Sequence, residues 1–199
     1  MRRFALILCL CAVALFATFA HAQQLDIAGG AGEMYSTSNT NASLAYLPPA
    51  EKGGIYPSVS VVRLFNNRFG YSAELSTVYK RQFYNGFQAY RPILYDVNAV
   101  FAPHLALKRA SANFMAGIGG QTVLFYNQYA NCNFAEGCVP RVNGTNFLLH
   151  LGAGLHYTVW RNFFVRPEAN FYRVIDNSNF HSGNVLRLGA SFGYTFHIE

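Results

Sequence analysis

The sequence has no second long apolar run after the one at its start, and it has few charges. Charged residues make up only 12% of the 199 residues, with 9 acidic against 15 Lys and Arg, and there are four cysteines and one tryptophan. The scattered cations form no basic stripe with interleaved aromatics, which argues against a nucleic-acid partner. Hydrophobic residues nevertheless make up 52% of the chain. High apolar content without a helix-length run favours strands that cross a membrane.

The apolar run at the start has the features of an export signal. Arg2 and Arg3 precede it, and the small-x-small pattern at 20–22 that follows is typical of a signal-peptidase site. The run is shorter than the roughly 20 residues of a spanning helix. We expect a signal peptide over residues 1–22 and one mature domain over residues 23–199. Loss of the two arginines lowers the formal charge from +6 to +4, which suits contact with anionic lipid head groups.

The last stretch of the chain, 185–196, has large apolar residues at alternate positions. One face carries the bulky residues Leu186, Leu188, Phe192, Tyr194 and Phe196. The other face carries the small residues Gly189, Ser191 and Gly193. Such alternation predicts a strand with lipid on one side and a crowded polar lumen on the other.

Seven further segments have strand character, most clearly the third, fourth and sixth strands of the chain. In order they are Leu25–Tyr35, Ile55–Phe65, Gly70–Lys80, Ile93–Ala102, Ala112–Tyr126, Phe147–Val159 and Phe164–Val174. Glycines at 29–30 and 117–120 indicate bulges or tight packing. Aromatic residues near the expected strand ends predict interfacial girdles: Tyr56, Tyr79, Tyr126, Tyr157, Trp160, Phe163 and Tyr194.

The connections between these segments alternate in length. Long polar segments lie at 36–53, 81–91, 127–145 and 175–184, and shorter ones lie at 66–69, 103–111 and 161–163. Outer-membrane barrels have long outside loops and short periplasmic turns. With eight strands, both termini are therefore expected on the periplasmic side.

With this architecture the mature chain resembles the small bacterial outer-membrane β-barrel proteins of the eight-stranded, OmpA-like or OmpX-like kind. One motif adds to the resemblance, because Arg187-x-Gly189-x-x-Phe192-x-Tyr194 and the nearby Phe196 are similar to the signal read by the barrel-assembly machinery. The resemblance implies an all-β, eight-stranded antiparallel up-and-down transmembrane barrel. It also implies a place in the bacterial outer membrane, among its lipid and lipopolysaccharide.

A soluble up-and-down barrel such as a lipocalin is the rival interpretation, because its strands alternate too, with the apolar face turned inward. Glycine and serine share the minor face with charges, and tyrosine and phenylalanine crowd the major one. These features and the last strand favour lipid on the outside.

The polar faces predict a charged lumen. Its members are Glu74, Lys80, Asp96, His150, His156, Arg166, Glu168 and Arg187. Buried charges are costly unless they are paired, and an eight-stranded barrel is just wide enough for side chains to fill. We therefore expect a filled lumen of mutually paired groups, with a narrow path for water or ions as the alternative.

A hydrolase is a further alternative. A tight turn at 161–163 that keeps like faces together places His156 opposite Glu168, with Ser191 beside Glu168. These are hydrolase components, but a triad needs the histidine between the serine and the acid. The groups also point into the lumen, away from lipid. We therefore predict no catalytic residues.

Cys132 and Cys138 are the only cysteines outside the expected signal peptide. In an exported chain their spacing predicts a disulfide that closes a small loop. The segment lacks a CxxC pattern and a histidine, so a metal site is the weaker interpretation. No metal or cofactor is expected.

The segment 81–91 combines aromatic residues with flanking arginines. Phe83, Tyr84, Phe87 and Tyr90 are candidates for recognition of sugars, lipopolysaccharide or protein surfaces. They could equally cap the barrel rim and meet the outer leaflet. The leading hypothesis is a non-enzymatic outer-membrane barrel that contributes to envelope integrity or to surface interaction through its loops. A small-solute channel and a lipid hydrolase are the alternatives.

Overall fold

The computed structural model describes residues 23–36, 54–65, 68–84, 88–103, 109–126, 131–133, 137–139, 144–175 and 182–198. The expected signal peptide lies outside these residues. Eight long strands make up the fold: β1 (Gln23–Ser36), β2 (Ile55–Phe65), β3 (Phe69–Thr77), β5 (Gln88–Phe101), β6 (Ala110–Phe125), β9 (Gly144–Trp160), β10 (Phe163–Val174) and β11 (Asn184–Ile198). Three short strands complete the described set: β4 (Gln82–Tyr84), β7 (Asn131–Asn133) and β8 (Gly137–Val139).

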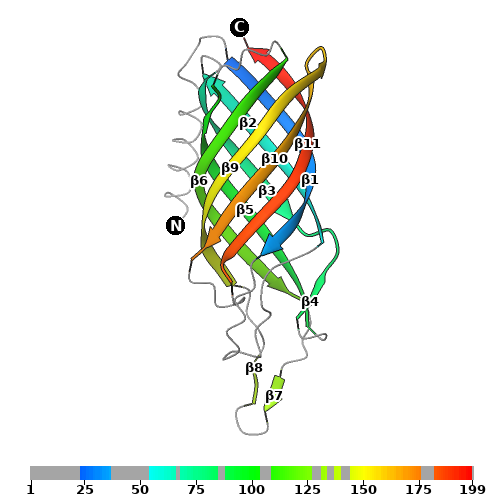
Figure 1. Ribbon diagram of the computed structural model, residues 1–199. Helices are drawn as coiled ribbons and strands as arrows, with labels where there is room; N and C mark the ends of the chain where they lie inside the picture. The colour runs from blue at the N-terminus through cyan, green and yellow to red at the C-terminus, as the bar shows by residue number, and fades with distance from the viewer. Residues whose placement is uncertain are drawn as a thin grey trace, which may run out of the picture.

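The eight long strands close into a barrel (Figure 1). Each pairs antiparallel with its sequence neighbour among the long strands. The first and last strands, β1 and β11, pair over their full length and complete the ring. The prediction of an all-β, eight-stranded antiparallel up-and-down barrel is confirmed.

The two ends of the barrel differ in the length of their connections. At one end, here called the turn end, lie the short connections β2–β3, β5–β6 and β9–β10, and Gln23 pairs with Ile198 there. The other end, here called the loop end, carries the long connections and the short strands β4, β7 and β8 (Figure 1). Both ends of the described chain thus lie at the turn end.

The strand boundaries differ from the expected ones in two places that matter for the site. β3 ends at Thr77 instead of Lys80, and β5 begins at Gln88 instead of Ile93. The glycine-rich part of β6 keeps a regular register with both neighbours, so tight packing and not a bulge explains it. The one register shift between β9 and β10 occurs at Phe163 and Phe164.

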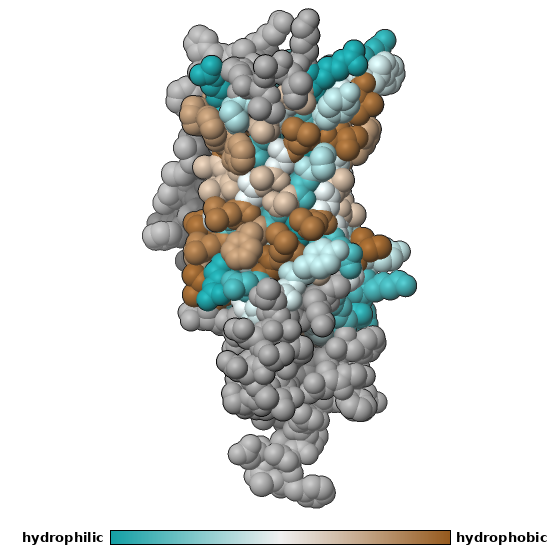
Figure 2. Space-filling view, in the orientation of Figure 1, coloured by the Kyte–Doolittle hydropathy of each residue, from teal (hydrophilic) through white to brown (hydrophobic). Residues whose placement is uncertain are grey.

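The outer face of the wall is apolar. Val97 is 59% exposed and Phe192 56% exposed, and both belong to a larger set of outward hydrophobic residues. Figure 2 shows apolar side chains gathered in two bands across the visible face of the barrel, with a paler zone between them. Aspartate, glutamate, arginine and histidine side chains lie buried inside instead. This polarity confirms the lipid-outside arrangement over the lipocalin-like one. None of the described residues forms a helix long and apolar enough to cross a membrane.

Aromatic side chains gather on the outer face at the turn end. The ring of Phe163 lies 6.0 Å from Trp160, 5.7 Å from Phe192 and 5.0 Å from Tyr194 between centroids. Such a cluster suits the head-group level of a bilayer. Tyr56, expected in a girdle, is fully buried and points inward, because it shares the inward face of β2 with Ser58.

The interior is layered along the barrel axis. Near the loop end lies an apolar cluster, the loop-end cluster, of Met34, Tyr56, Val78, Leu94, Leu148, Tyr172, Val174 and Val185. Near the turn end lies a second apolar cluster, the turn-end cluster, of Val62, Leu64, Val100, Ala102 and Met115. Between these two clusters most inward side chains are polar or charged, and Ala28, paired with Ser60, is a buried apolar one.

Candidate functional site

The charged lumen is the candidate site. The structure buries seven of the eight residues that the sequence analysis placed there: Glu74, Asp96, His150, His156, Arg166, Glu168 and Arg187. Lys80 lies elsewhere, exposed beyond the end of β3. The alternation that assigned Lys80 to the lumen stops applying once the strand ends at Thr77.

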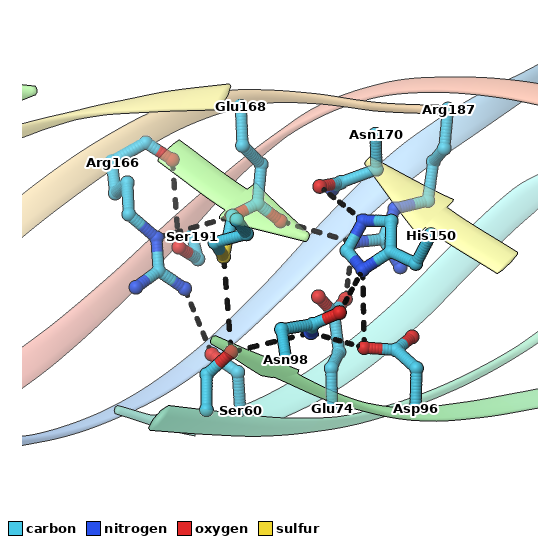
Figure 3. A network of polar contacts seen from close by, with 12 residues as sticks. Ser60, Glu74, Asp96, Asn98, His150, Arg166, Glu168, Asn170, Arg187 and Ser191 are labelled. Atoms are coloured by element: carbon cyan, nitrogen blue, oxygen red, sulfur yellow. Dashed lines mark hydrogen bonds and ion pairs between the residues drawn. The ribbon is translucent and has the colours of Figure 1, made fainter. Parts of the chain in front are cut away.

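Arg187 joins three strands at the centre of the lumen (Figure 3). Its guanidinium donates from Nη2 to Glu74 Oε1 and, over 3.1 Å, to Glu168 Oε1. Arg187 comes from β11, Glu168 from the adjacent β10, and Glu74 from β3. The contact to Glu74 thus links strands that are not neighbours in the sheet. Arg187 therefore braces one side of the barrel against the other.

Arg166 extends this ionic network. Its Nε donates to Glu168 Oε2 over 3.1 Å, and its Nη2 donates to Ser60 Oγ over 2.8 Å. Glu168 consequently accepts from both arginines, one on each carboxylate oxygen. Charge-assisted hydrogen bonds of this kind are stronger than neutral ones. We call the five residues Ser60, Glu74, Arg166, Glu168 and Arg187 the central network.

His150 lies beside the central network, held from three sides (Figure 3). Its Nδ1 is 2.7 Å from Asn98 Oδ1 and 3.2 Å from Asp96 Oδ1, and its Nε2 is 3.0 Å from Asn170 Oδ1. The ring stacks on Tyr172 with 4.6 Å between centroids. A Cβ at Gly152 would lie 2.5 Å from Asn170 Oδ1, so glycine there leaves room for this contact.

His156 occupies a second ionic group nearer the turn end. Its Nδ1 lies 3.4 Å from Asp26 Oδ2, and its ring stacks on Phe164 at 4.1 Å between centroids. Asp26 also accepts from Thr195 Oγ1 over 2.7 Å and from Gln24 Nε2 over 2.9 Å. Sequence reasoning missed Asp26. A signal was present, since Asp26 and Ala28 share the inward face of β1, but the following glycines hide the alternation.

Each buried carboxylate of the interior has a basic side chain beside it. Four buried carboxylates face two buried arginines and two buried histidines: Asp26, Glu74, Asp96 and Glu168 against Arg166, Arg187, His150 and His156. Each carboxylate lies within 4.0 Å of at least one of these cationic or ionisable groups. These pairings favour one arrangement of the strands around them, although Arg166 Nη1 and Arg187 Nη1 are buried without a hydrogen-bond partner within the described structure.

The expected juxtaposition of His156, Glu168 and Ser191 is wrong. Glu168 pairs with Gly154 on β9 and with Gly189 on β11, while Ser191 pairs with Arg166. Glu168 thus lies two residues from the pairing assumed from the sequence, and the register shift between Phe163 and Phe164 accounts for one of the two. No hydrolytic triad forms among these residues. Among the described residues there is also no group of three or more His, Cys, Asp or Glu that could hold a metal ion.

Of the aromatic candidates in the segment 81–91, the structure describes the side chain of Tyr90 alone, and it lies inside the barrel. Tyr90 is buried, because β5 already begins at Gln88, and its hydroxyl donates to Gln82 Oε1 over 2.7 Å. Tyr90 therefore packs at the mouth of the lumen, against Val123 and Phe125. The side chains of Phe83, Tyr84 and Phe87 lie outside the described residues.

The residues of the last-strand motif divide between the two faces of β11. Arg187 and Gly189 point inward, and Arg187 is part of the central network. Phe192 and Phe196 are exposed on the outer face, and Tyr194 is half-buried beside Phe163. The residues predicted to form an assembly signal therefore comprise a buried arginine of the central network and aromatic residues of the outer face.

The short paired strands β7 and β8 carry Cys132 and Cys138, the two cysteines outside the expected signal peptide. Their register places Cys132 opposite Cys138. This pairing supports the proposed disulfide, since cross-strand partners lie at a separation that a disulfide can bridge.

Replacing both cysteines, in C132S/C138S, is expected to leave the barrel intact. The bond would close a short loop and stabilise it by about 2 kcal/mol, with no effect on the strands. The temperature of the heat-dependent gel shift should stay unchanged, while proteolysis within 127–143 becomes faster. A barrel that melts several degrees earlier in the variant would contradict this expectation.

Several solved structures share this fold and are distant in sequence. No protein-family model and no curated protein matches the chain. The N-terminal β-barrel domain of Pseudomonas aeruginosa OprF superposes with a TM-score of 0.57 at 12% identity, covering 88% of this chain and 100% of that domain. Neisserial surface protein A has a TM-score of 0.57 at 13% identity, over 87% of this chain and 97% of that one.

A third similar structure is Ail, the attachment invasion locus protein of Yersinia pestis, in complex with the heparin analogue sucrose octasulfate. Its TM-score is 0.55 at 13% identity, over 88% of this chain and 99% of that chain. At such identities the likeness extends to the fold and no further. The chain thus has the fold of the small eight-stranded bacterial outer-membrane β-barrels.

Proposed function

We propose that this protein is a non-conducting outer-membrane barrel and a rigid scaffold for its long loops. Through these loops it contributes to envelope integrity or to surface interaction. The observation that carries the proposal is the layered interior. The polar middle of the lumen lies between the loop-end cluster and the turn-end cluster, both apolar and buried. Water and ions crossing the lumen would have to pass the loop-end cluster and the central network, and then the turn end, where Asp26 and His156 lie beside the turn-end cluster.

The ion pairs of the interior stabilise the barrel as a scaffold and do not catalyse a reaction. Arg187 links β11 to β3 across the lumen, so the ion pairs hold the wall in one shape. The same fold occurs in Ail, the attachment invasion locus protein, which was solved with a heparin analogue bound. Variation between such proteins belongs to their loops, since loops on a rigid scaffold carry recognition.

The test of the sealed lumen is a planar-bilayer recording on purified full-length protein whose barrel is verified by a heat-dependent gel shift. We expect no conductance above background. Steady channel activity from protein that shows the gel shift would overturn the proposal in favour of a narrow channel.

The proposed orientation has the long loops outside and both termini in the periplasm. Trypsin added to intact cells should then cut the long connections, which contain Lys52 and Arg141, and spare the short turns with Arg68 and Arg161. Cleavage confined to the short turns would contradict the orientation.

We also propose that residues 1–22 are removed on export and that the barrel-assembly machinery reads Arg187, Gly189, Phe192, Tyr194 and Phe196.

A further inference from the structure

Two arginines converge on one tyrosine ring on the outer wall at the loop end. The guanidinium carbon of Arg81 lies 4.2 Å from the ring centroid of Tyr126, and that of Arg91 lies 5.8 Å from the same centroid. The three residues come from the segment after β3, from β5 and from the end of β6. Arg91 Nη2 also donates to the carbonyl oxygen of Tyr79 at 3.5 Å. We call Tyr79, Lys80, Arg81, Arg91 and Tyr126 the cationic rim.

The cationic rim has no carboxylate partner among the described residues. All five ion pairs of the described chain lie in the lumen. Glu33, the one described acidic residue on the outer face, accepts from Tyr35 instead. Arg91 Nε is buried and has no hydrogen-bond partner within the described structure. Two guanidinium groups held together without an anion are poised to bind one, and planar guanidinium suits phosphate in particular.

The position of the cationic rim indicates which kind of anion it binds. Arg91 pairs with Leu124 on β6, and the same outward faces continue toward the middle of the barrel with Tyr95, Val97 and Ile118. Val97 is 59% exposed and Ile118 57% exposed, so this strip is lipid-facing. The cationic rim therefore lies where the apolar belt ends, at the level of lipid head groups.

A hollow on the same wall could receive an acyl chain. It measures about 450 Å³ and its lining includes the outward residues Ile27, Gly29, Val59, Val61, Ala73 and Leu75. All its lining residues come from β1, β2 and β3 and none from the opposite wall, which places it on the outer surface. Leu75 precedes Tyr79 by four residues, which is about 13 Å along an extended chain. That is a distance an acyl chain spans below its head group.

We propose that the cationic rim binds the phosphate of a phosphorylated membrane lipid of the leaflet at the loop end, with one acyl chain of that lipid along the β1–β3 hollow. Arg81 and Arg91 contact the phosphate, Lys80 adds a third positive charge, and the Tyr126 ring holds both guanidinium groups in place. In the orientation proposed above, the lipid A part of lipopolysaccharide supplies this chemistry. The inference rests on that placement in the membrane.

The test is lipid binding by purified full-length protein in phosphatidylcholine nanodiscs, with diphosphorylated lipid A as the probe and native mass spectrometry as the readout. R81Q/R91Q should bind lipid A more weakly by about tenfold or more, because each charged hydrogen bond to phosphate contributes about that factor. R68Q/R161Q is the matched control, since it removes two exposed arginines from the turn end. This control should bind as the unchanged protein does.

Three further results decide the proposal. Loss of binding in both variants alike would overturn it, because binding would then follow net charge. Competition by a soluble phosphorylated glucosamine at the affinity of lipid A would overturn the lipid assignment, and absence of competition supports it. R81K/R91K should bind between the unchanged protein and R81Q/R91Q. A heat-dependent gel shift on every variant separates loss of the site from loss of the membrane barrel itself.

Discussion

Replacing Arg187 by leucine is expected to destabilise the refolded barrel by about 3–5 kcal/mol, because it leaves buried carboxylates without their cation. Glu74 would lose its ion pair, and Glu168 would keep only its contact with Arg166. The measurement is the free energy of unfolding in urea, with refolding into phospholipid vesicles. R173L is the control for loss of an arginine, since Arg173 is exposed and hydrogen-bonded to Asn184. It should change stability by less than about 0.5 kcal/mol.

The double variant E74Q/R187L separates the cost of unpaired charge from the loss of a contact, because it removes one cation and one carboxylate and leaves the ion pair between Arg166 and Glu168 in place. Removing the two charges together should recover most of the stability, since replacing a whole buried ion pair is often neutral. In cells the double variant should still fail to reach the folded barrel if Arg187 is also read by the assembly machinery. An R187L barrel as stable in vitro as the unchanged protein would contradict the bracing role.

The fold could be predicted from the sequence because a membrane barrel leaves a period-two signature in every strand. β2 illustrates this, since its inward positions are all buried and its two boundaries match the expected ones. The same signature located seven of the eight lumen residues. It holds only while a strand continues, which is why Lys80 and Tyr90 were misplaced at the ends of β3 and β5.

What the sequence could not supply was register. Alternation shows that His156 and Glu168 share a face, but not which residues lie opposite each other. The turn and the one-residue register shift that follows it place Glu168 opposite Gly154 instead of His156. It equally could not show that Arg187 reaches Glu74, since β3 and β11 are not neighbours. The cationic rim went undetected for the same reason. Arg81, Arg91 and Tyr126 are separated in the sequence and meet only through strand pairing.

The loop-end cluster should be what keeps water out of the central network from that side. Leu94 and Leu148 belong to this cluster, and each is at most 1% exposed. L94A/L148A is expected to lose about 2–5 kcal/mol of stability for each substitution and to leave space above the polar middle of the lumen. Water should then reach the central network from the loop end.

Access is measured with S60C in the C132S/C138S background, using a small water-soluble thiol reagent on protein in vesicles. Ser60 is buried in the central network, so its cysteine should react slowly, through rare opening of the barrel. L94A/L148A should raise the rate by roughly tenfold or more, through local access. I93A/L149A makes the same kind of change at the adjacent outward positions and should not raise it. Equal labelling in the two double variants would mean that the apolar layer does not seal the lumen, and the central network alone would then have to keep ions out.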